Sequence, residues 1–186
     1  MKYTKGNKTR LEIFNTAVEM FLDKGYDNVQ IRDIVKEVGV SIGSFYYHFP
    51  KKECIIDEGY RLFDEELQEE YKADAPQEGR EAILYLLRKQ IDAILNRGLD
   101  FACIFFKYQL GIEHNYYFRE DRFLTTKLQE NCKVLLSEQE AKKLSEALLR
   151  ASRGAIYDWC LHSGQYDLHT IAMEDIVIIL DYYTSK

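Results

Sequence analysis

The sequence predicts an all-α protein: an N-terminal three-helix unit with a helix-turn-helix, residues 1–50, followed by a larger helical region, residues 51–186. Apolar residues recur at helical spacing along most of the chain, which is typical of helices that bury one face. Only two prolines interrupt the 186 residues, and 46% of the residues are hydrophobic, enough for an ordinary globular core. A glycine at position 39 and a serine at position 41 separate two short helical patterns.

The first predicted helix covers Lys8 to Lys24, and Gly25 is placed to end it. Its apolar stripe consists of Phe14, Ala17, Val18 and Phe21. A second pattern follows, with Ile31, Ile34, Val35 and Val38 on one face. Gly39 ends this helix, because glycine takes the left-handed conformation without steric cost. Ser41 is a good N-cap for a third helix, so residues 30 to 52 predict two helices across a tight turn.

The third helix has an inner and an outer face. Phe45 and Phe49 lie one turn apart and are expected to anchor it in the core, and Pro50 ends it. The outer face is small, hydroxylated and aromatic, and such side chains suit a DNA major groove and its phosphates. It comprises Ile42, Gly43, Ser44, Tyr46, Tyr47 and His48. Lys51 and Lys52 follow, where their charges can approach a phosphate strand.

The segment GVSIGSFYYHFPKKECI resembles the recognition segment of the TetR family of bacterial transcriptional regulators, of the TetR/AcrR type. TRLEIFNTAVEMFLDKGYDNVQIRDI is similar to that family's first helix and the entry to the second. The resemblance covers about the first third of the chain and implies a helix-turn-helix DNA-binding domain in residues 1–50. It implies DNA contacts from Gln30, Ser41, Ile42, Gly43, Ser44, Tyr46, Tyr47, His48 and Lys52.

Gln30 departs from the family pattern, which usually has a threonine that caps the second helix and touches phosphate. Glutamine reaches phosphate but caps poorly, so either Asn28 takes over the cap or this corner is looser than usual.

The charge of the chain is unevenly distributed. Net charge is −6, yet residues 1–53 hold nine Lys and Arg against seven Asp and Glu, which leaves 16 basic and 24 acidic side chains for the rest. A basic module on an acidic body can bind phosphate locally while the body discourages unspecific coating of DNA. The four cysteines are far apart and fit reduced thiols in a cytoplasmic protein, and no membrane span or secretory signal is expected.

The region after residue 50 predicts further helices. Their expected ranges are 51–73, 81–96, 123–136, 138–162 and 169–183. The first of these begins next to the third helix, whose outer face is expected to meet DNA. It is therefore expected to transmit changes between the two domains. Residues 51–186 are therefore predicted to form a helical ligand-binding and dimerisation domain, as in the resembling family.

Residues 99 to 118 are the most aromatic stretch of the chain, and aromatic side chains with polar tips are typical of small-molecule sites. We expect a small apolar or aromatic effector to contact Phe63, Phe101, Phe105, Tyr108, Tyr116, Tyr117 and Trp159. The alternative is that these rings fill a helical core.

The last two predicted helices have faces that suit packing against a second copy of the chain. Ala151, Gly154 and Ala155 permit close approach, and residues 176–180 are continuously apolar. The resemblance implies a four-helix homodimer interface, for which we expect Leu148, Ala151, Ala155, Ile176, Ile179 and Leu180. Burial within one chain is the alternative.

No catalytic or metal-binding constellation can be assembled: His48, His114, His162 and His169 lack metal-ligand spacing, and neither a nucleophile elbow nor a phosphate loop is found. The favoured function is that of a sequence-specific transcriptional regulator. We expect a dimeric repressor that binds double-stranded DNA and leaves it when an effector binds, with no enzymatic activity and no cofactor. One alternative is a thiol redox sensor using Cys103 or Cys160 on the same scaffold. Another is a helical small-molecule-binding or assembly protein without DNA affinity.

Overall fold

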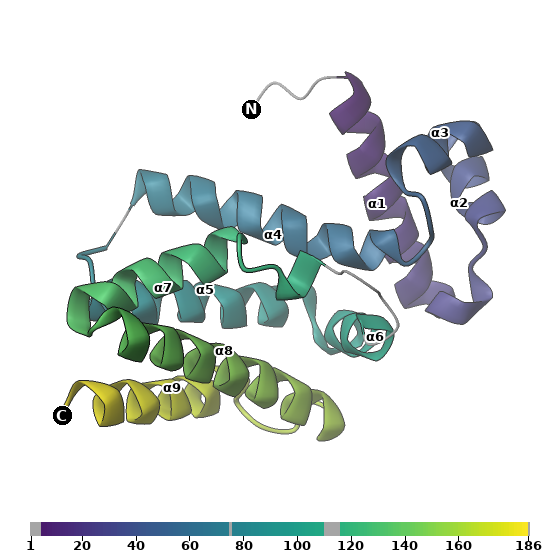
Figure 1. Ribbon diagram of the computed structural model, residues 1–186. Helices are drawn as coiled ribbons and strands as arrows, with labels where there is room; N and C mark the ends of the chain where they lie inside the picture. The colour runs from purple at the N-terminus through teal and green to yellow at the C-terminus, as the bar shows by residue number, and fades with distance from the viewer. Residues whose placement is uncertain (1–4, 75, 110–115, 186) are drawn as a thin grey trace. The chain divides into compact units, whose positions relative to one another are not determined.

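The computed structural model describes residues 5–74, 76–109 and 116–185, and the regular secondary structure in these ranges is helical, without a strand (Figure 1). The α-helices are α1 (Lys5–Lys24), α2 (Ile31–Val38), α3 (Ile42–His48), α4 (Cys54–Ala73), α5 (Arg80–Arg97), α6 (Leu99–Gln109), α7 (Phe123–Leu135), α8 (Glu138–Leu161) and α9 (Leu168–Thr184). Two short 3₁₀ segments, η1 (Tyr26–Asn28) and η2 (Tyr116–Phe118), precede α2 and α7. The all-α prediction is confirmed, and the predicted helix bounds agree within a few residues.

The chain forms two compact units. Unit 1 comprises residues 1–61 and 104–116, and unit 2 comprises residues 62–103 and 117–186. Helices α4 and α6 each contribute to both units, because the divisions fall inside them. The first turns of α4 therefore belong to the same compact unit as the N-terminal helices, whereas the predicted functional boundary at residue 50 assigns all of α4 to the second domain. The functional boundary stays a prediction.

The core of unit 1 is built from one face of each of its helices. Ile13 and Ala17 of α1, Ile34 of α2 and Ile55 of α4 are completely buried. A methyl group at Gly59 would overlap the ring of Phe105, so the close packing of α4 against α6 inside this unit requires a glycine.

Unit 2 is a helical bundle in which α5, α7, α8 and α9 pack side by side (Figure 1). Its core includes Leu86 and Leu87 of α5, Leu128 of α7 and Leu144 of α8. Asp64 of α4 also forms a bidentate ion pair with Arg122, at 2.8 and 2.9 Å, and both side chains are almost fully buried. Arg122 further donates to the carbonyl oxygen of Tyr117 at 3.1 Å, so the guanidinium ties α4 to the segment that enters α7.

None of the helices in the described ranges is long and apolar enough to cross a membrane.

Candidate nucleic-acid interface

The turn between α2 and α3 has the predicted helix-turn-helix conformation. Gly39 lies in the left-handed region, with φ 77° and ψ 30°. The N–H groups of Gly39 and Val40 both donate to the carbonyl oxygen of Val35 at 3.0 Å, which closes the end of α2. Ser41 caps α3, because its Oγ accepts from the Ser44 N–H at 3.1 Å. Local sequence therefore fixes where α3 begins.

Helix α3 presents the two predicted faces. Phe45 and Phe49 are completely buried, which confirms them as the core anchors. On the other side the ring of Tyr47 is 83% exposed, and Ile42 and Tyr46 are about half exposed, at 52% and 49%. Among the other predicted DNA contacts, Gln30, Ser41 and Gly43 are exposed, and Ser44 and His48 are half-buried. Large exposed side chains on a short helix form a surface free to meet a ligand as large as a duplex.

Gln30 lies at the start of α2, and a residue that sequence reasoning did not select, Asp33, helps to close this corner. Gln30 occupies the N-cap of α2, and its backbone N–H donates to Oδ2 of Asp33 at 3.0 Å. Asn28 does not cap α2, since its side-chain amide donates to the carbonyl oxygen of Lys24 at 2.8 Å. The expectation that Asn28 replaces the missing threonine is therefore wrong. Asp33, three residues after the cap, gives the reciprocal half of a capping box.

Lys52 is used inside unit 1. Its Nζ donates to the carbonyl oxygens of Tyr26 and Val29 at 2.7 and 2.8 Å and lies 3.9 Å from the centre of the Tyr26 ring. Burial lowers the pKa of this ammonium group, although Asp27 and Glu53 oppose the shift. Lys52 thus joins the start of α4 to the segment between α1 and α2, and its predicted phosphate contact stays a prediction. Lys51 beside it is exposed and offers an available cation.

A buried carboxylate holds α1, α3 and α4 together. Glu58 of α4 is 3% exposed and accepts from Nε and Nη2 of Arg10 at 2.7 and 2.6 Å and from Nε of Arg61 at 2.8 Å. Arg10 also donates to the carbonyl oxygen of His48 at 3.1 Å and lies 4.8 Å from the centre of the Phe49 ring. The basic residue Arg10 is therefore a structural link to the end of α3.

The electrostatics of this cluster follow from its geometry. Burial opposes ionisation of Glu58, but hydrogen bonds from Arg61 and Arg10 outweigh burial and hold the pKa of its carboxyl below the usual 4.5. Burial, and then the charge of Arg10, lower the pKa of His48. His48 is therefore neutral at pH 7, and its ring can donate one hydrogen bond.

The predicted effector residues are divided between the two units, and most are used in packing. In unit 1, Phe105 packs against Gly59, Tyr108 stacks on Tyr26 at 3.9 Å and donates to Asp27, and the Tyr116 N–H donates to Asp57 at 2.6 Å. In unit 2, Phe101, Tyr117 and Trp159 are buried, and Phe63 is half-buried. Residues 110–115 of the aromatic stretch, His114 included, lie outside the described residues.

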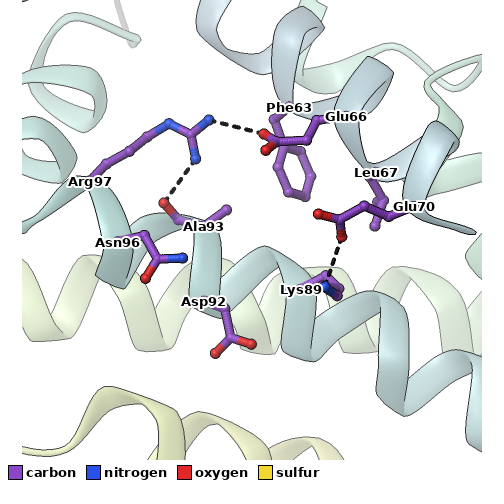
Figure 2. A pocket seen from close by; sticks show the side chains of 9 residues that line it. All are labelled: Phe63, Glu66, Leu67, Glu70, Lys89, Asp92, Ala93, Asn96 and Arg97. Carbon is purple, nitrogen blue, oxygen red and sulfur yellow. Dashed lines mark hydrogen bonds and ion pairs between the residues drawn. The ribbon is translucent and has the colours of Figure 1, made fainter.

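Unit 2 contains an open groove of about 360 Å³ between α4 and α5 (Figure 2). Phe63, Leu67 and Ala93 give it apolar surface. Two ion pairs cross it from one helix to the other: Glu70 with Lys89 at 2.8 Å, and Glu66 with Arg97 at 3.5 Å. Asp92 and Asn96 complete the lining. Of the seven predicted effector residues, Phe63 lines this groove.

Half of the predicted dimer residues belong instead to the core of their own chain. Leu148, Ile176 and Leu180 are completely buried within unit 2, so they have no surface to offer a partner, and their selection was wrong. Ala151, Ala155 and Ile179 are half-buried. A continuously apolar helix cannot reveal from sequence which turn faces its own bundle. The exposed apolar side chains of α8 and α9 are Tyr157, Leu161, Ile171, Ile178 and Tyr182.

No cluster of three or more His, Cys, Asp or Glu side chains suited to a metal ion occurs among the residues that the structure describes.

Comparison with known proteins agrees with this geometry. Residues 13–59, which include α2, α3 and the start of α4, match the family described as "Bacterial regulatory proteins, tetR family". The transcriptional regulator AcrR of Shigella flexneri is 24% identical over 96% of this chain and 91% of its own length. Residues 13–59 of this chain therefore resemble the regulators of the TetR family. The chain is a helix-turn-helix transcriptional regulator.

Other relatives are similar over shorter segments. The repressor KstR2 of Rhodococcus jostii is 35% identical over 34% of this chain and 31% of its own length. The similarity of the fold covers more of the chain. FadR of Bacillus subtilis in complex with stearoyl-CoA has a TM-score of 0.64 and 19% identity, covering 94% of this chain and 97% of that one. FadR of Thermus thermophilus, in complex with lauroyl-CoA, has a TM-score of 0.60 and 21% identity over 92% and 93% of the two chains.

We predict that Glu58→Gln lowers the free energy of unfolding at pH 7 by about 2 kcal/mol, because two partly buried guanidinium groups lose their shared carboxylate. The contribution of Glu58 is fully present above its usual pKa of 4.5 and is lost as pH falls through the lowered value in the folded protein. Urea unfolding at pH 7 and pH 3 measures both effects, and the difference between variant and wild type should shrink at pH 3. Glu12→Gln, at an exposed pair with Lys8, is the control and should change stability by less than about 0.5 kcal/mol. An equal loss at both pH values would contradict the assignment.

Proposed function

We propose that this protein is a TetR-family repressor that binds a near-palindromic operator as a homodimer and releases it when an apolar effector binds. The observation that carries the proposal is the exposed outer face of α3, held by a capped turn and two buried phenylalanines. The protein acts in the cytoplasm on double-stranded DNA and catalyses no reaction.

The DNA contacts divide by chemistry. Ile42 can meet a thymine methyl group, Gly43 lets the backbone approach the groove, and Ser44 can bond either base edge. Tyr46, Tyr47 and His48 have groups that donate to phosphate oxygens and fix the register, and Lys51 adds charge. Two copies of α3 in a two-fold dimer must enter major grooves about 34 Å apart or a multiple of that distance, so the operator is an inverted repeat.

Selection of duplexes from a random DNA pool tests the DNA proposal directly. Wild type should enrich an inverted repeat, and Tyr47→Ala should weaken binding to that repeat at least about tenfold, because it removes an exposed contact without touching the core. Lys51→Ala should weaken binding to all sequences alike and reduce the salt dependence by about one ion.

Leu22→Ala is the matched control, since Leu22 is 42% exposed on α1 in the same unit. It should bind like wild type. If wild type enriches no sequence even at low salt, the unliganded protein is not a DNA-binding repressor. That result would favour the alternative of a helical small-molecule-binding or assembly protein without DNA affinity.

We propose that the effector is an apolar or aromatic molecule that binds unit 2 at the groove between α4 and α5. Phe63, Leu67 and Ala93 give the groove apolar surface, and its volume of about 360 Å³ falls within the range of small-molecule sites. The two solved FadR structures contain acyl-CoA molecules with long apolar chains. Helix α4 contributes to the groove with residues beyond 61 and to unit 1 with residues up to 61, so it can couple effector and DNA binding as a population shift.

Lauroyl-CoA is a suitable probe for this proposal. We expect it to release a fluorescent operator duplex from wild type, and Phe63→Ala should raise the concentration needed by about tenfold, because Phe63 is the largest apolar side chain that lines the groove. Val134→Ala, at an exposed apolar residue of α7 that does not line the groove, is the control. Release by free coenzyme A to the same extent, or release unaffected by Phe63→Ala, would overturn the assignment of the groove.

We propose that the dimer forms through α8 and α9, using the exposed apolar side chains rather than the buried ones. Ala151 and Ala155 have short side chains, so a second helix can approach the backbone of α8 closely. Tyr157 and Leu161 on α8, and Ile178 and Tyr182 on α9, supply apolar area that is unusual on a monomer surface.

Ile178→Lys should convert the dimer to a monomer at micromolar concentration, because a desolvated ammonium group at an apolar interface has no partner. Sedimentation velocity measures the change. Val134→Lys introduces the same charge at a comparably exposed apolar residue, 56% against 66% for Ile178, and should stay dimeric. A wild type that sediments as a monomer, or an Ile178→Lys variant that remains a dimer, would show that this face is not the interface.

A further inference from the structure

Two cysteines that are distant in sequence meet in unit 2. Cys103 lies on α6 and Cys160 near the end of α8, and the two thiols are close enough for Cys103 to raise the pKa of Cys160. Both are free and half-buried. Sequence reasoning considered either cysteine as an isolated sensor, because nothing in the chain indicates that they are neighbours.

Packing around the pair independently places the start of α6 against the end of α8. Leu99 lies one turn before Cys103, and Trp159 directly precedes Cys160. Both side chains meet at Gly164: a Cβ there would lie 3.5 Å from Leu99 Cδ2 and 3.4 Å from Trp159 Cζ2. Trp159 is also fixed by a hydrogen bond from its indole N–H to the carbonyl oxygen of Tyr166 at 3.2 Å. The start of α6 and the end of α8 therefore both lie against Gly164.

The other two cysteines lie in different surroundings. Cys132 is completely buried in the core of unit 2, and burial raises its pKa to about 12, so it is an inert thiol. Cys54 begins α4 in unit 1 and is half-buried. Cys54 is therefore the natural control for a thiol of similar accessibility outside the pair.

We propose that Cys103 and Cys160 are a reversible modification site that takes up low-molecular-weight disulfides and closes to an intramolecular disulfide between α6 and α8. In the first step the Cys103 thiolate attacks one sulfur of the small disulfide, forms a mixed disulfide and expels one small thiolate. In the second step the Cys160 thiolate attacks the Cys103 sulfur and expels the second small thiolate. Two protein thiols are oxidised to one disulfide, and one small disulfide is reduced to two thiols.

The environment of Cys160 assigns the order of the steps. Burial, followed by the charge of Cys103 and the hydrogen bond between the thiols, raises the pKa of Cys160 to about 12. Because this pKa leaves Cys160 protonated at neutral pH, we assign the first attack to Cys103. Once Cys103 carries the mixed disulfide, Cys160 is already beside it, so ring closure is favoured over attack by a second external thiol.

The disulfide between Cys103 and Cys160 would link α6 to α8 within unit 2. Cys103 is the last residue of unit 2 before the chain passes into unit 1 at Ile104. The disulfide would close a loop of more than 50 residues that includes α7 and most of α8, and this restricts the unfolded chain. This inference does not depend on DNA binding or on the effector.

The test uses the full chain in glutathione buffers of increasing oxidised fraction, followed by alkylation with iodoacetamide and mass analysis. Wild type should lose two alkylatable thiols together, and digestion should give one cross-linked peptide pair containing Cys103 and Cys160. Dithiothreitol should restore both thiols. Cys54→Ser should behave like wild type, whereas Cys103→Ser and Cys160→Ser should form no internal disulfide. The oxidised wild type should unfold roughly 5 °C higher than the reduced protein, and Cys103→Ser should show no such shift.

Several results would overturn the proposal. An unchanged number of alkylated thiols at every buffer ratio would show that the pair does not close. A glutathione mixed disulfide that persists on one cysteine, without a second step that expels the glutathione, would show that the thiols do not meet. A cross-link through Cys54 would assign the reactivity to another site. The peptide analysis of wild type decides among these outcomes without any variant, so a poorly folding variant leaves the test intact.

Discussion

The arrangement of helices in unit 1 depends on the hydrogen bonds that the carboxylate of Glu58 accepts. Burying a single charge is costly, and here several charge-assisted hydrogen bonds from Arg10 and Arg61 offset that cost. Because Arg10 also holds the carbonyl oxygen of His48, the same cluster that joins α1 to α4 fixes the end of α3. The orientation of the exposed face of α3 therefore follows from an ion cluster buried behind it.

Helix α3 has seven residues and would not be stable in isolation. It is held at its start by the Ser41 cap, along its inner face by Phe45 and Phe49, and at its end by Arg10. Lys52 adds a second fastening, from the start of α4 to the segment between α1 and α2. The side chains of the outer face are consequently not needed to hold α3 in place, so they are available for binding.

Unit 2 uses most of its aromatic and apolar side chains for packing, so few remain for a ligand. The rings of Phe101, Tyr117 and Trp159 are buried, and the buried Asp64–Arg122 pair joins α4 to the entry of α7. The open groove between α4 and α5 is lined by charged side chains as well as by Phe63. The paired thiols of Cys103 and Cys160 lie elsewhere, at the meeting of α6 and α8, so effector and redox chemistry would act through different helices.

The sequence by itself determined the helices, the turn at Gly39, the Ser41 cap and the two faces of α3, because these follow from interactions between residues within about four positions. The tertiary structure alone decided that Lys52 and Arg10 turn inward, and that Leu148, Ile176 and Leu180 belong to the core. It also decided that Cys103 and Cys160 meet. These outcomes depend on which helices become neighbours, whereas the hydrogen bond from the Gln30 N–H to Asp33 is a local signal that sequence reasoning overlooked. Periodicity identifies a buried face, but it does not identify the element that covers that face.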